Sequence, residues 1–162
     1  MKKIFLIIIL ANTFLNCQSK SETAFSSEAL TEQLISVDGE KFKFGEVLQE
    51  NNGNYIFINV WASWCKDCIV SLSDLKELQR KNSSVKFLYL SLDKSIKKWK
   101  EGIKKYGIEG DHFFLSNGKK GPLGKFLTID WIPRYLIVNP EGKIALFKAI
   151  ETNDENLLNL LK

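Results

Sequence analysis

Two cysteines, Cys65 and Cys68, stand at the junction between a predicted strand and a predicted helix. The run from Tyr55 to Trp61 is β-branched and aromatic, which is typical of a buried strand. A strand that leads directly into a helix is typical of an α/β fold in which helices cover a parallel sheet. The helix is predicted over Cys65 to Arg80, where apolar residues recur at helical spacing: Ile69, Leu72, Leu75 and Leu78.

This junction gives the two cysteines their expected chemistry. The first turn of a helix has unpaired N–H groups and the positive end of the helix dipole, which stabilise a thiolate and lower the pKa of a cysteine there. Two intervening residues bring the sulfurs within bonding distance, so a disulfide can open and close with little backbone movement. We therefore expect Cys65, partly exposed at the helix start, to be the attacking thiolate, and Cys68, one turn inside, to resolve the mixed disulfide.

Other interpretations of the cysteine pair have less support. A zinc site needs about four ligands, and the one histidine, His112, and the remote Cys17 are the candidates that remain. A static structural disulfide would close a very small loop and would add little stability. We favour a redox-active pair with no metal and no cofactor, and we interpret His112 as a strand-edge residue rather than a catalytic base.

The rest of the chain alternates strands and helices. The middle reads strand, helix, strand, helix and then a hairpin, which predicts parallel pairing, helices on both faces and a mixed sheet. Asp38-Gly39 between two apolar runs indicates a further hairpin at the start of the domain. The remaining predicted elements are a strand at Val85 to Leu92, a lysine-rich helix ending near Gly107, strands at Arg134 to Asn139 and Lys143 to Phe147, and a helix at Glu155 to Leu161.

The first sixteen residues are typical of a secretory signal. Lys2 and Lys3 precede an apolar run, Ile4 to Ala11, that is shorter than the roughly 20 residues of a bilayer span. Without these two lysines the chain has 21 basic and 19 acidic residues, an ordinary balance that gives no reason to expect a nucleic-acid partner.

The signal ends in Phe14-Leu15-Asn16-Cys17, which resembles the lipobox of bacterial lipoproteins, although Asn16 stands where a small residue is typical. We expect Cys17 to be lipidated; the alternative is ordinary signal cleavage that leaves an incidental thiol. Residues 17–30 are rich in Ser, Glu and Lys and are predicted to be a flexible tether. Residues 31–162 are predicted to form one domain.

Two motifs carry a resemblance to a known family. Residues 61–68, Trp-Ala-Ser-Trp-Cys-Lys-Asp-Cys, and the later Trp131-Ile132-Pro133 resemble the thioredoxin superfamily, specifically its TlpA/ResA-type envelope proteins. The likeness covers about residues 32–161. It implies a thioredoxin-like three-layer α/β/α sandwich with a mixed central sheet and an N-terminal β-hairpin.

The resemblance also implies a substrate site. It predicts a cis peptide bond before Pro133, in a loop that faces the cysteines, and a backbone at Ile132 that offers hydrogen bonds to an extended peptide. Trp64 is expected to cover the sulfur pair, whereas Trp61 is expected to lie in the core.

Charged residues at the helix start are expected to tune the cysteines. Lys66 is expected to lower the pKa of Cys65, and Asp67 to oppose this effect by like-charge repulsion. Asn59 stands where thioredoxin has a buried Asp, so the sequence names no proton acceptor for the second cysteine. Asp93, at the end of a predicted strand, is interpreted as a helix cap or loop carboxylate near the active edge of the sheet.

The function implied is a thiol–disulfide oxidoreductase that acts on protein substrates in the cell envelope, facing the periplasm or the outside of the cytoplasmic membrane. Similar proteins are mostly reductants, recharged by a membrane partner, for example in cytochrome c maturation or repair of oxidised proteins. A peroxiredoxin-like peroxidase expects Pro and Thr where Ile58 and Ala62 stand. A non-catalytic binding module is disfavoured because both cysteines, Trp64 and the Ile132-Pro133 pair are present.

Overall fold

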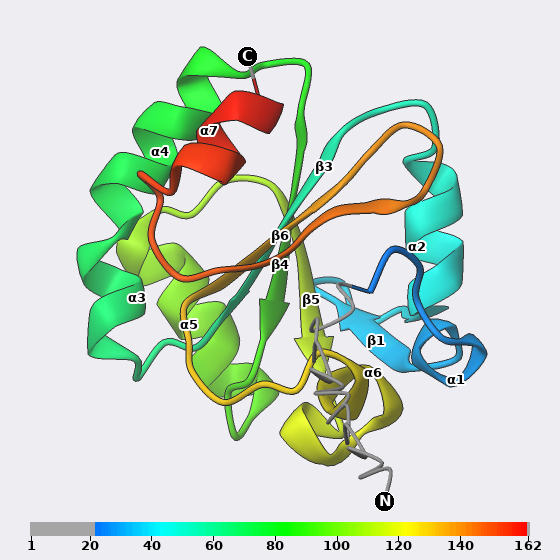
Figure 1. The fold of residues 1–162 in the computed structure, drawn as a ribbon. Helices are drawn as coiled ribbons and strands as arrows, with labels where there is room; N and C mark the ends of the chain where they lie inside the picture. The colour runs from blue at the N-terminus through cyan, green and yellow to red at the C-terminus, as the bar shows by residue number, and fades with distance from the viewer. Residues whose placement is uncertain (1–21, 162) are drawn as a thin grey trace, which may run out of the picture.

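A twisted seven-stranded sheet runs through the molecule (Figure 1). The computed structural model describes residues 22–161. The strands lie in the order β2-β1-β5-β4-β3-β6-β7. Their bounds are β1 Gln33–Ser36, β2 Lys41–Lys43, β3 Ile56–Trp61, β4 Lys86–Ser91, β5 Asp111–Leu115, β6 Arg134–Val138 and β7 Ile144–Ala149.

The centre of the sheet is parallel and its flanks are antiparallel. β3 pairs with β4, and β4 with β5, in parallel register, whereas β6 and β7 add to the β3 side in antiparallel register. Every residue of β3 and of β6 is buried, because helices and neighbouring elements cover both faces of these strands. The expected mixed sheet and the N-terminal hairpin of β1 and β2 are confirmed.

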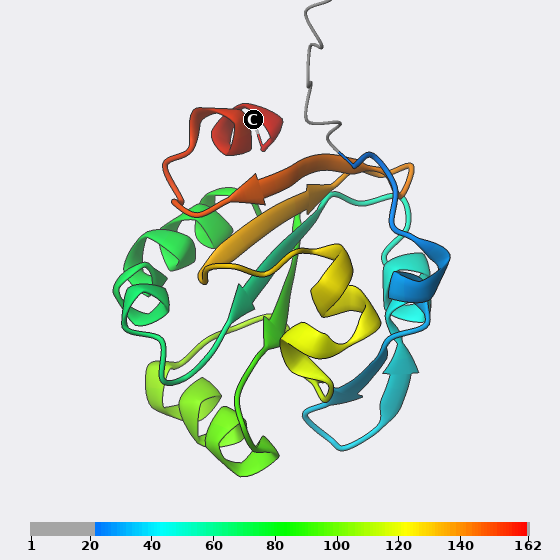
Figure 2. The same ribbon diagram turned by 60° about the horizontal axis from the view of Figure 1, so that its bottom comes forward.

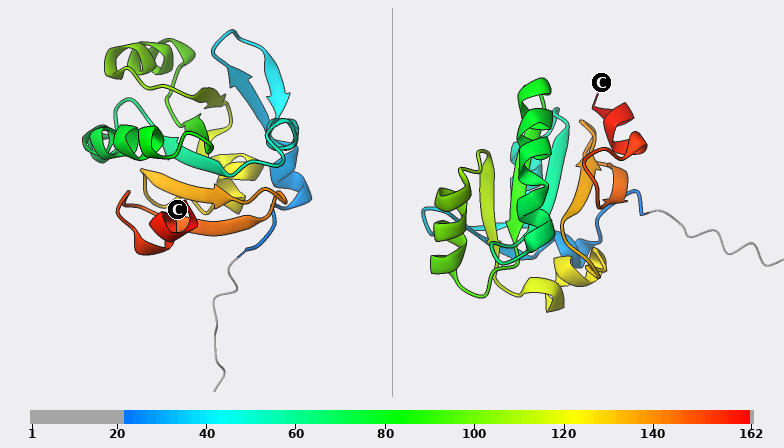
Figure 3. Two further views of the ribbon diagram at one scale, coloured as in Figure 1. Left: turned by 90° about the horizontal axis from the view of Figure 1, so that it is seen from above. Right: turned by 90° about the vertical axis from the view of Figure 1, so that its left-hand side faces the viewer.

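Helices cover the two faces of the sheet. The connections β3 to β4 and β4 to β5 step in the same direction along the sheet, so right-handed crossovers place their helices on one face. Figure 3 shows α4, α5 and α7 on this face and α1, α2 and α6 toward the other. The bounds are α1 Ser27–Leu30, α2 Phe44–Glu50, α3 Lys66–Val70, α4 Leu72–Lys81, α5 Ile96–Tyr106, α6 Pro122–Phe126 and α7 Glu155–Leu160.

The single helix predicted after the cysteines is two helices. α3 and α4 meet at Ser71, whose Oγ donates a hydrogen bond of 3.0 Å to the carbonyl oxygen of Cys68. The hydroxyl of Tyr135 in β6 donates to the same Oγ at 3.0 Å. A serine that bonds back to a carbonyl of the previous turn bends a helix, so a short helix carries the cysteine pair and the longer α4 packs against the sheet.

The tether prediction is wrong for its last residues. Phe25 packs against Phe44 and Phe126 with ring centroids 4.9 and 5.5 Å apart, and Ala29 in α1 is buried. The carbonyl oxygen of Thr23 accepts a hydrogen bond of 2.9 Å from the backbone of β7. The folded domain therefore begins before residue 31, because Phe25, an aromatic residue in a mostly polar segment, packs against apolar side chains of the domain.

The predicted signal peptide and Cys17 lie outside the described residues. Within residues 22–161, no helix has both the length and the apolar character that crossing a bilayer requires.

Candidate active site

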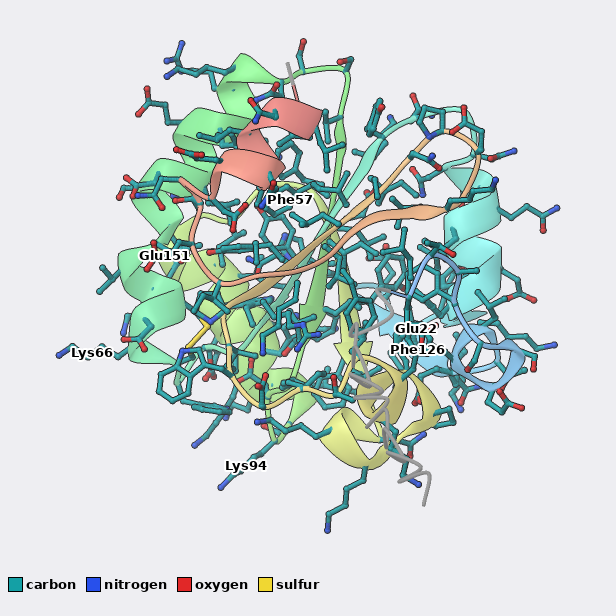
Figure 4. The ribbon with its side chains drawn as sticks, viewed as in Figure 1. Glu22, Phe57, Lys66, Lys94, Phe126 and Glu151 are labelled. Atoms are coloured by element: carbon teal, nitrogen blue, oxygen red, sulfur yellow. A yellow bond between two sulfur atoms is a disulfide. The ribbon has the colours of Figure 1, made fainter. Side chains whose placement is uncertain are left out.

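Cys65 and Cys68 form a disulfide at the start of α3, with Cα atoms 5.3 Å apart. Figure 4 shows this bond in yellow. Cys65 is the N-cap of α3, and its Sγ accepts a hydrogen bond of 3.1 Å from the backbone N–H of Cys68. The backbone N–H of Cys68, in the first turn of the helix, therefore points at the sulfur, which is the geometry that stabilises a thiolate.

Cys65 is more buried than the sequence suggested. It is 6% exposed, and Cys68 is 2% exposed. The carbonyl oxygen of Ile132 lies 3.5 Å from the Sγ of Cys65, and the loop that carries this carbonyl shields the sulfur. The exposed part of Cys65 faces a cavity of about 320 Å³. The cavity is lined by Trp64, Cys65, Lys66, Asp67, Lys119, Asp130, Trp131 and Ile132.

The loop before β6 brings Ile132 and Pro133 to the cysteines. The peptide bond between them is cis, as predicted. β6 pairs with β3 from Arg134 onward, so the start of β6 lies beside the end of β3, where the cysteine segment begins. Figure 2 turns this end of the sheet toward the viewer. The sheet pairing therefore places side by side two motifs that are 67 residues apart.

Two tryptophans flank the disulfide at the surface. Trp64 is 58% exposed and Trp131 is 56% exposed, and both line the cavity that opens on Cys65. Trp61 is fully buried in the core, as expected. The sequence prediction did not single out Trp131 as a functional residue. Large exposed apolar side chains often mark an interaction surface.

A second cavity of about 370 Å³ lies on the other side of Trp131. It shares Asp67 and Trp131 with the first cavity, so the two cavities are neighbours at the tryptophan. Pro133 and Glu151 line it from the opposite side, and Figure 4 shows Glu151 at the end of β7 beside α3. Lys66 extends from the start of α3 away from the body of the molecule (Figure 4).

Asp93 is a buried carboxylate attached to the cysteine segment. It is 5% exposed, and its Oδ1 accepts a 2.6 Å hydrogen bond from the hydroxyl of Ser63. Its Oδ2 accepts hydrogen bonds from the backbone N–H of Ser63 at 3.0 Å and from the hydroxyl of Ser91 at 2.9 Å. Of the two interpretations of Asp93, the loop carboxylate is confirmed and the helix cap is not: Ser95 caps α5, and Asp93 is a loop carboxylate with a long-range partner, Ser63.

A set of side chains next to the loop of Pro133 holds that loop. Arg134 is fully buried, and its Nη1 donates to the carbonyl of Thr128 at 3.3 Å and to Oδ1 of Asp130 at 3.4 Å. Lys148 donates to Oδ2 of Asp130 at 2.7 Å, and this hydrogen bond lowers the pKa of Asp130 to about 2. The guanidinium of Arg134 also lies 5.2 Å from the ring centre of Phe147.

Three buried polar side chains of the sheet, those of Tyr135, Asn59 and His112, differ in how they could exchange a proton. Burial raises the pKa of Tyr135 to about 12, so its hydroxyl stays protonated near neutral pH. Asn59 is buried in β3 and has an amide that does not titrate near neutral pH. His112 does not lie at a sheet edge, since β5 is between β1 and β4; burial lowers its pKa, and its Nε2 lies 2.9 Å from the carbonyl of Ile108.

A disulfide at the amino end of a helix, facing a cis-proline loop across the end of a mixed sheet, defines a thiol–disulfide oxidoreductase of thioredoxin fold. The comparisons with known proteins agree with this class. A family model described as thioredoxin-like matches residues 52–144, so the chain belongs to the thioredoxin-like family.

Relatives and solved structures support the same assignment. The chain is 25% identical over 131 residues to the thiol-disulfide oxidoreductase ResA of Bacillus thuringiensis subsp. konkukian, covering 80% of this chain and 72% of ResA. It is 27% identical to a solved thiol-disulfide oxidoreductase from Bacteroides fragilis, with a TM-score of 0.64 over 80% of this chain and 96% of that one. A thioredoxin domain from Bacteroides vulgatus, 22% identical, shares the fold with a TM-score of 0.66 over 85% and 94% of the two chains.

Proposed function

We propose that the protein reduces disulfides of protein substrates in the cell envelope, with Cys65 as the attacking thiolate and Cys68 as the resolving cysteine. The single observation that carries these roles is the position of Cys65. Its sulfur is the cap of α3, and it is also the cysteine that faces the surface cavity and the carbonyl of Ile132. Cys68 is 2% exposed, so a protein substrate reaches Cys65 first.

The exchange balances in two steps. In the reduced protein, the Cys65 thiolate attacks one sulfur of a substrate disulfide, and a mixed disulfide forms as the first substrate thiolate leaves. The sulfur of Cys68 then attacks Cys65, which forms the Cys65–Cys68 disulfide seen in the structure and releases the second substrate thiolate. Two electrons pass to the substrate, and its two thiolates take up the proton of the Cys68 thiol and the proton that Cys65 released to solvent on ionisation.

We propose that the surface around the disulfide binds the substrate as an extended segment. Trp64 and Trp131 supply apolar contact area on both sides of Cys65. Ile132 and Pro133 lie between them, where the backbone of a loop can form strand-like hydrogen bonds to a peptide. Aromatic side chains at such sites bury much surface at a low cost in side-chain entropy.

Lys66 and Asp67 are proposed to tune the reactivity of Cys65 in opposite directions. Both lie in the first turn of α3 and line the cavity that opens on Cys65. A cation there favours the thiolate and a carboxylate disfavours it. An uncharged residue in place of Lys66 is therefore expected to make Cys65 less reactive, and one in place of Asp67 to make it more reactive.

The cell-envelope location is proposed from the amino-terminal segment and from the relatives named ResA. The proposal is a lipid anchor on Cys17, an orientation toward the periplasm or the outside, and a membrane partner that returns electrons to the cysteine pair. Two or more acyl chains would anchor the domain firmly, whereas one chain is marginal. Metabolic labelling with a fatty acid tests the anchor, since Cys17→Ser removes the label if the cysteine is the lipidation site.

Trapping in the native cell tests the proposed roles. Cys68→Ser leaves the attacking cysteine without a resolving partner, so we expect a covalent complex with the substrate that reductant dissolves. Cys65→Ser is the matched control and is expected to trap nothing. Complexes with Cys65→Ser and none with Cys68→Ser would reverse the roles, and a failure of the wild-type pair to form a reversible bridge across glutathione ratios would refute the redox function itself.

A further inference from the structure

We propose that Asp93 is a positioning residue for Cys65 and that it acts through Ser63. The inference rests on the proposed role of Cys65 as the attacking thiolate. Asp93 follows β4, whereas Ser63 lies 30 positions earlier in the connection from β3 to α3. The carboxylate therefore links the carboxyl ends of two neighbouring parallel strands at the point where the cysteine segment begins.

Asp93 accepts hydrogen bonds from both the backbone and the side chain of Ser63. The backbone N–H and the hydroxyl of Ser63 both point at the carboxylate, at 3.0 and 2.6 Å from its oxygens. Ser91 orients the carboxylate in turn, since its hydroxyl donates to Asp93 and accepts from the Asp93 backbone N–H at 3.0 Å. Hydrogen bonds to a buried charged group are stronger than hydrogen bonds between neutral groups. The hydrogen bonds to Asp93 therefore hold Ser63 in one position.

α5 packs closely against Ser63. Gly102 is buried in α5, and a Cβ at that position would lie 2.5 Å from the Cβ of Ser63. Real Cβ atoms do not approach a neighbour this closely, so only glycine permits α5 to lie against the serine. The half-buried Ser63 therefore contacts both the carboxylate of Asp93 and the backbone of α5.

Fixing Ser63 fixes the sulfur of Cys65. Ser63 lies inside a turn in which the backbone N–H of Cys65 donates to the carbonyl of Ala62 at 3.1 Å. The same turn leads directly to the N-cap position where Sγ of Cys65 accepts from the N–H of Cys68. A shift of Ser63 moves the cap, and the thiolate then loses part of its alignment with the helix amides.

The carboxylate could also act through its charge, and two substitutions separate the two effects. Asp93→Asn removes the charge but keeps an oxygen that can accept from the Ser63 N–H, while its NH₂ can donate to the Ser63 hydroxyl. Asp93→Ala removes the charge and every side-chain hydrogen bond. Any difference between these two variants therefore reports positioning.

The experiment measures alkylation of each cysteine in the reduced full-length protein at neutral pH, with the modified peptides identified by mass spectrometry. We expect Cys65 of Asp93→Ala to react about fivefold more slowly than Cys65 of Asp93→Asn, the factor that corresponds to one ordinary hydrogen bond. Ser63→Ala, which keeps the backbone contact, is expected to lie between Asp93→Ala and the wild type, and it serves as the readout if Asp93→Ala does not fold. Ser26→Ala, which removes the cap of the remote helix α1, is the control and is expected to match the wild type.

Equal rates for Asp93→Ala and Asp93→Asn would overturn the inference, because charge alone would then account for any change. A wild-type rate for Ser63→Ala together with an unfolded Asp93→Ala would also overturn it. If Cys65 of the wild type reacts no faster than Cys68, the proposed role of Cys65 fails instead, so the two failures are distinguishable.

Discussion

The two loops that face each other across the disulfide are held by different means. The connection from β3 to α3 is fixed from inside the protein, through a buried carboxylate and a glycine on α5. The loop before Pro133 is tied partly at the surface, where the carboxylate of Asp130 is 63% exposed and binds a half-exposed lysine. Its buried residues include Ile129, Ile132 and Arg134, and the Nε and Nη2 of Arg134 have no hydrogen-bond partner among residues 22–161.

This difference separates the chemical and the recognition parts of the site. Buried hydrogen bonds act in a low dielectric and respond little to salt, so they suit the segment that must hold a thiolate at one place. Exposed ion pairs are weak and screened by salt, so a loop tied by them can adjust to different substrates. We infer that the cysteine loop sets the reaction and that the proline loop adapts to the partner.

Among substitutions that test the difference between the two loops, Gly102→Ala is expected to have the largest effect on stability and exchange rate. The added methyl collides with Ser63, and overpacking of this kind costs about 1–3 kcal/mol of stability. A displacement of the cap by about 1 Å can reduce the exchange rate up to about a hundredfold. Insulin reduction and denaturant unfolding measure the two effects. An unchanged exchange rate in a folded Gly102→Ala protein would show that the cysteine loop is less constrained than the packing implies.

An intermediate effect is expected at Arg134. Arg134→Met removes a buried charge whose partners are incomplete and retains much of the side-chain volume, so the free energy of unfolding is expected to stay the same or to rise. Arg134→Ala opens a cavity and is expected to be about 2–5 kcal/mol less stable than Arg134→Met. Chemical denaturation of the two variants gives the difference. A Met variant as unstable as the Ala variant would mean that the charge itself, rather than the packing, anchors the proline loop.

The smallest effect is expected from the surface pair of Asp130 and Lys148. The pKa of Asp130 is lowered to about 2 in the folded protein, below its ordinary value of about 4. Its contribution to stability is therefore complete above about pH 4 and is lost as the pH falls toward 2. Thermal unfolding of Asp130→Asn should match the wild type near pH 2, and high salt should shrink any difference at pH 7. A pH dependence between 5 and 8 that disappears in Asp130→Asn would contradict this assignment.

Much of the fold follows from local patterns in the sequence. The predicted strands at β3, β4, β6 and β7, the hairpin of β1 and β2, and the helices α5 and α7 are all present in the structure. The elements that sequence reasoning missed were α1, α2 and α6; a strand next to His112 was expected, but the bounds of β5 were not predicted. The helices among them have at most seven residues, which is too short for helical periodicity to become distinct. β5 has five residues, and its three apolar residues are consecutive rather than alternating, so no strand period marks its ends.

The candidate site also has a part that the sequence predicted and a part that it did not. The sequence by itself determined that two cysteines lie at the amino end of a helix, because the apolar strand, the helical spacing and the cysteines are neighbours along the chain. The family resemblance also predicted that the loop of Ile132 faces the cysteines, and the contact between Ile132 and Cys65 confirms this. Only the tertiary structure decided that Tyr135 contacts the helix break at Ser71 and that Asp93 forms hydrogen bonds with Ser63. Such polar contacts join residues 30 to 67 positions apart, and they depend on sheet pairing and burial, which leave no period in the sequence.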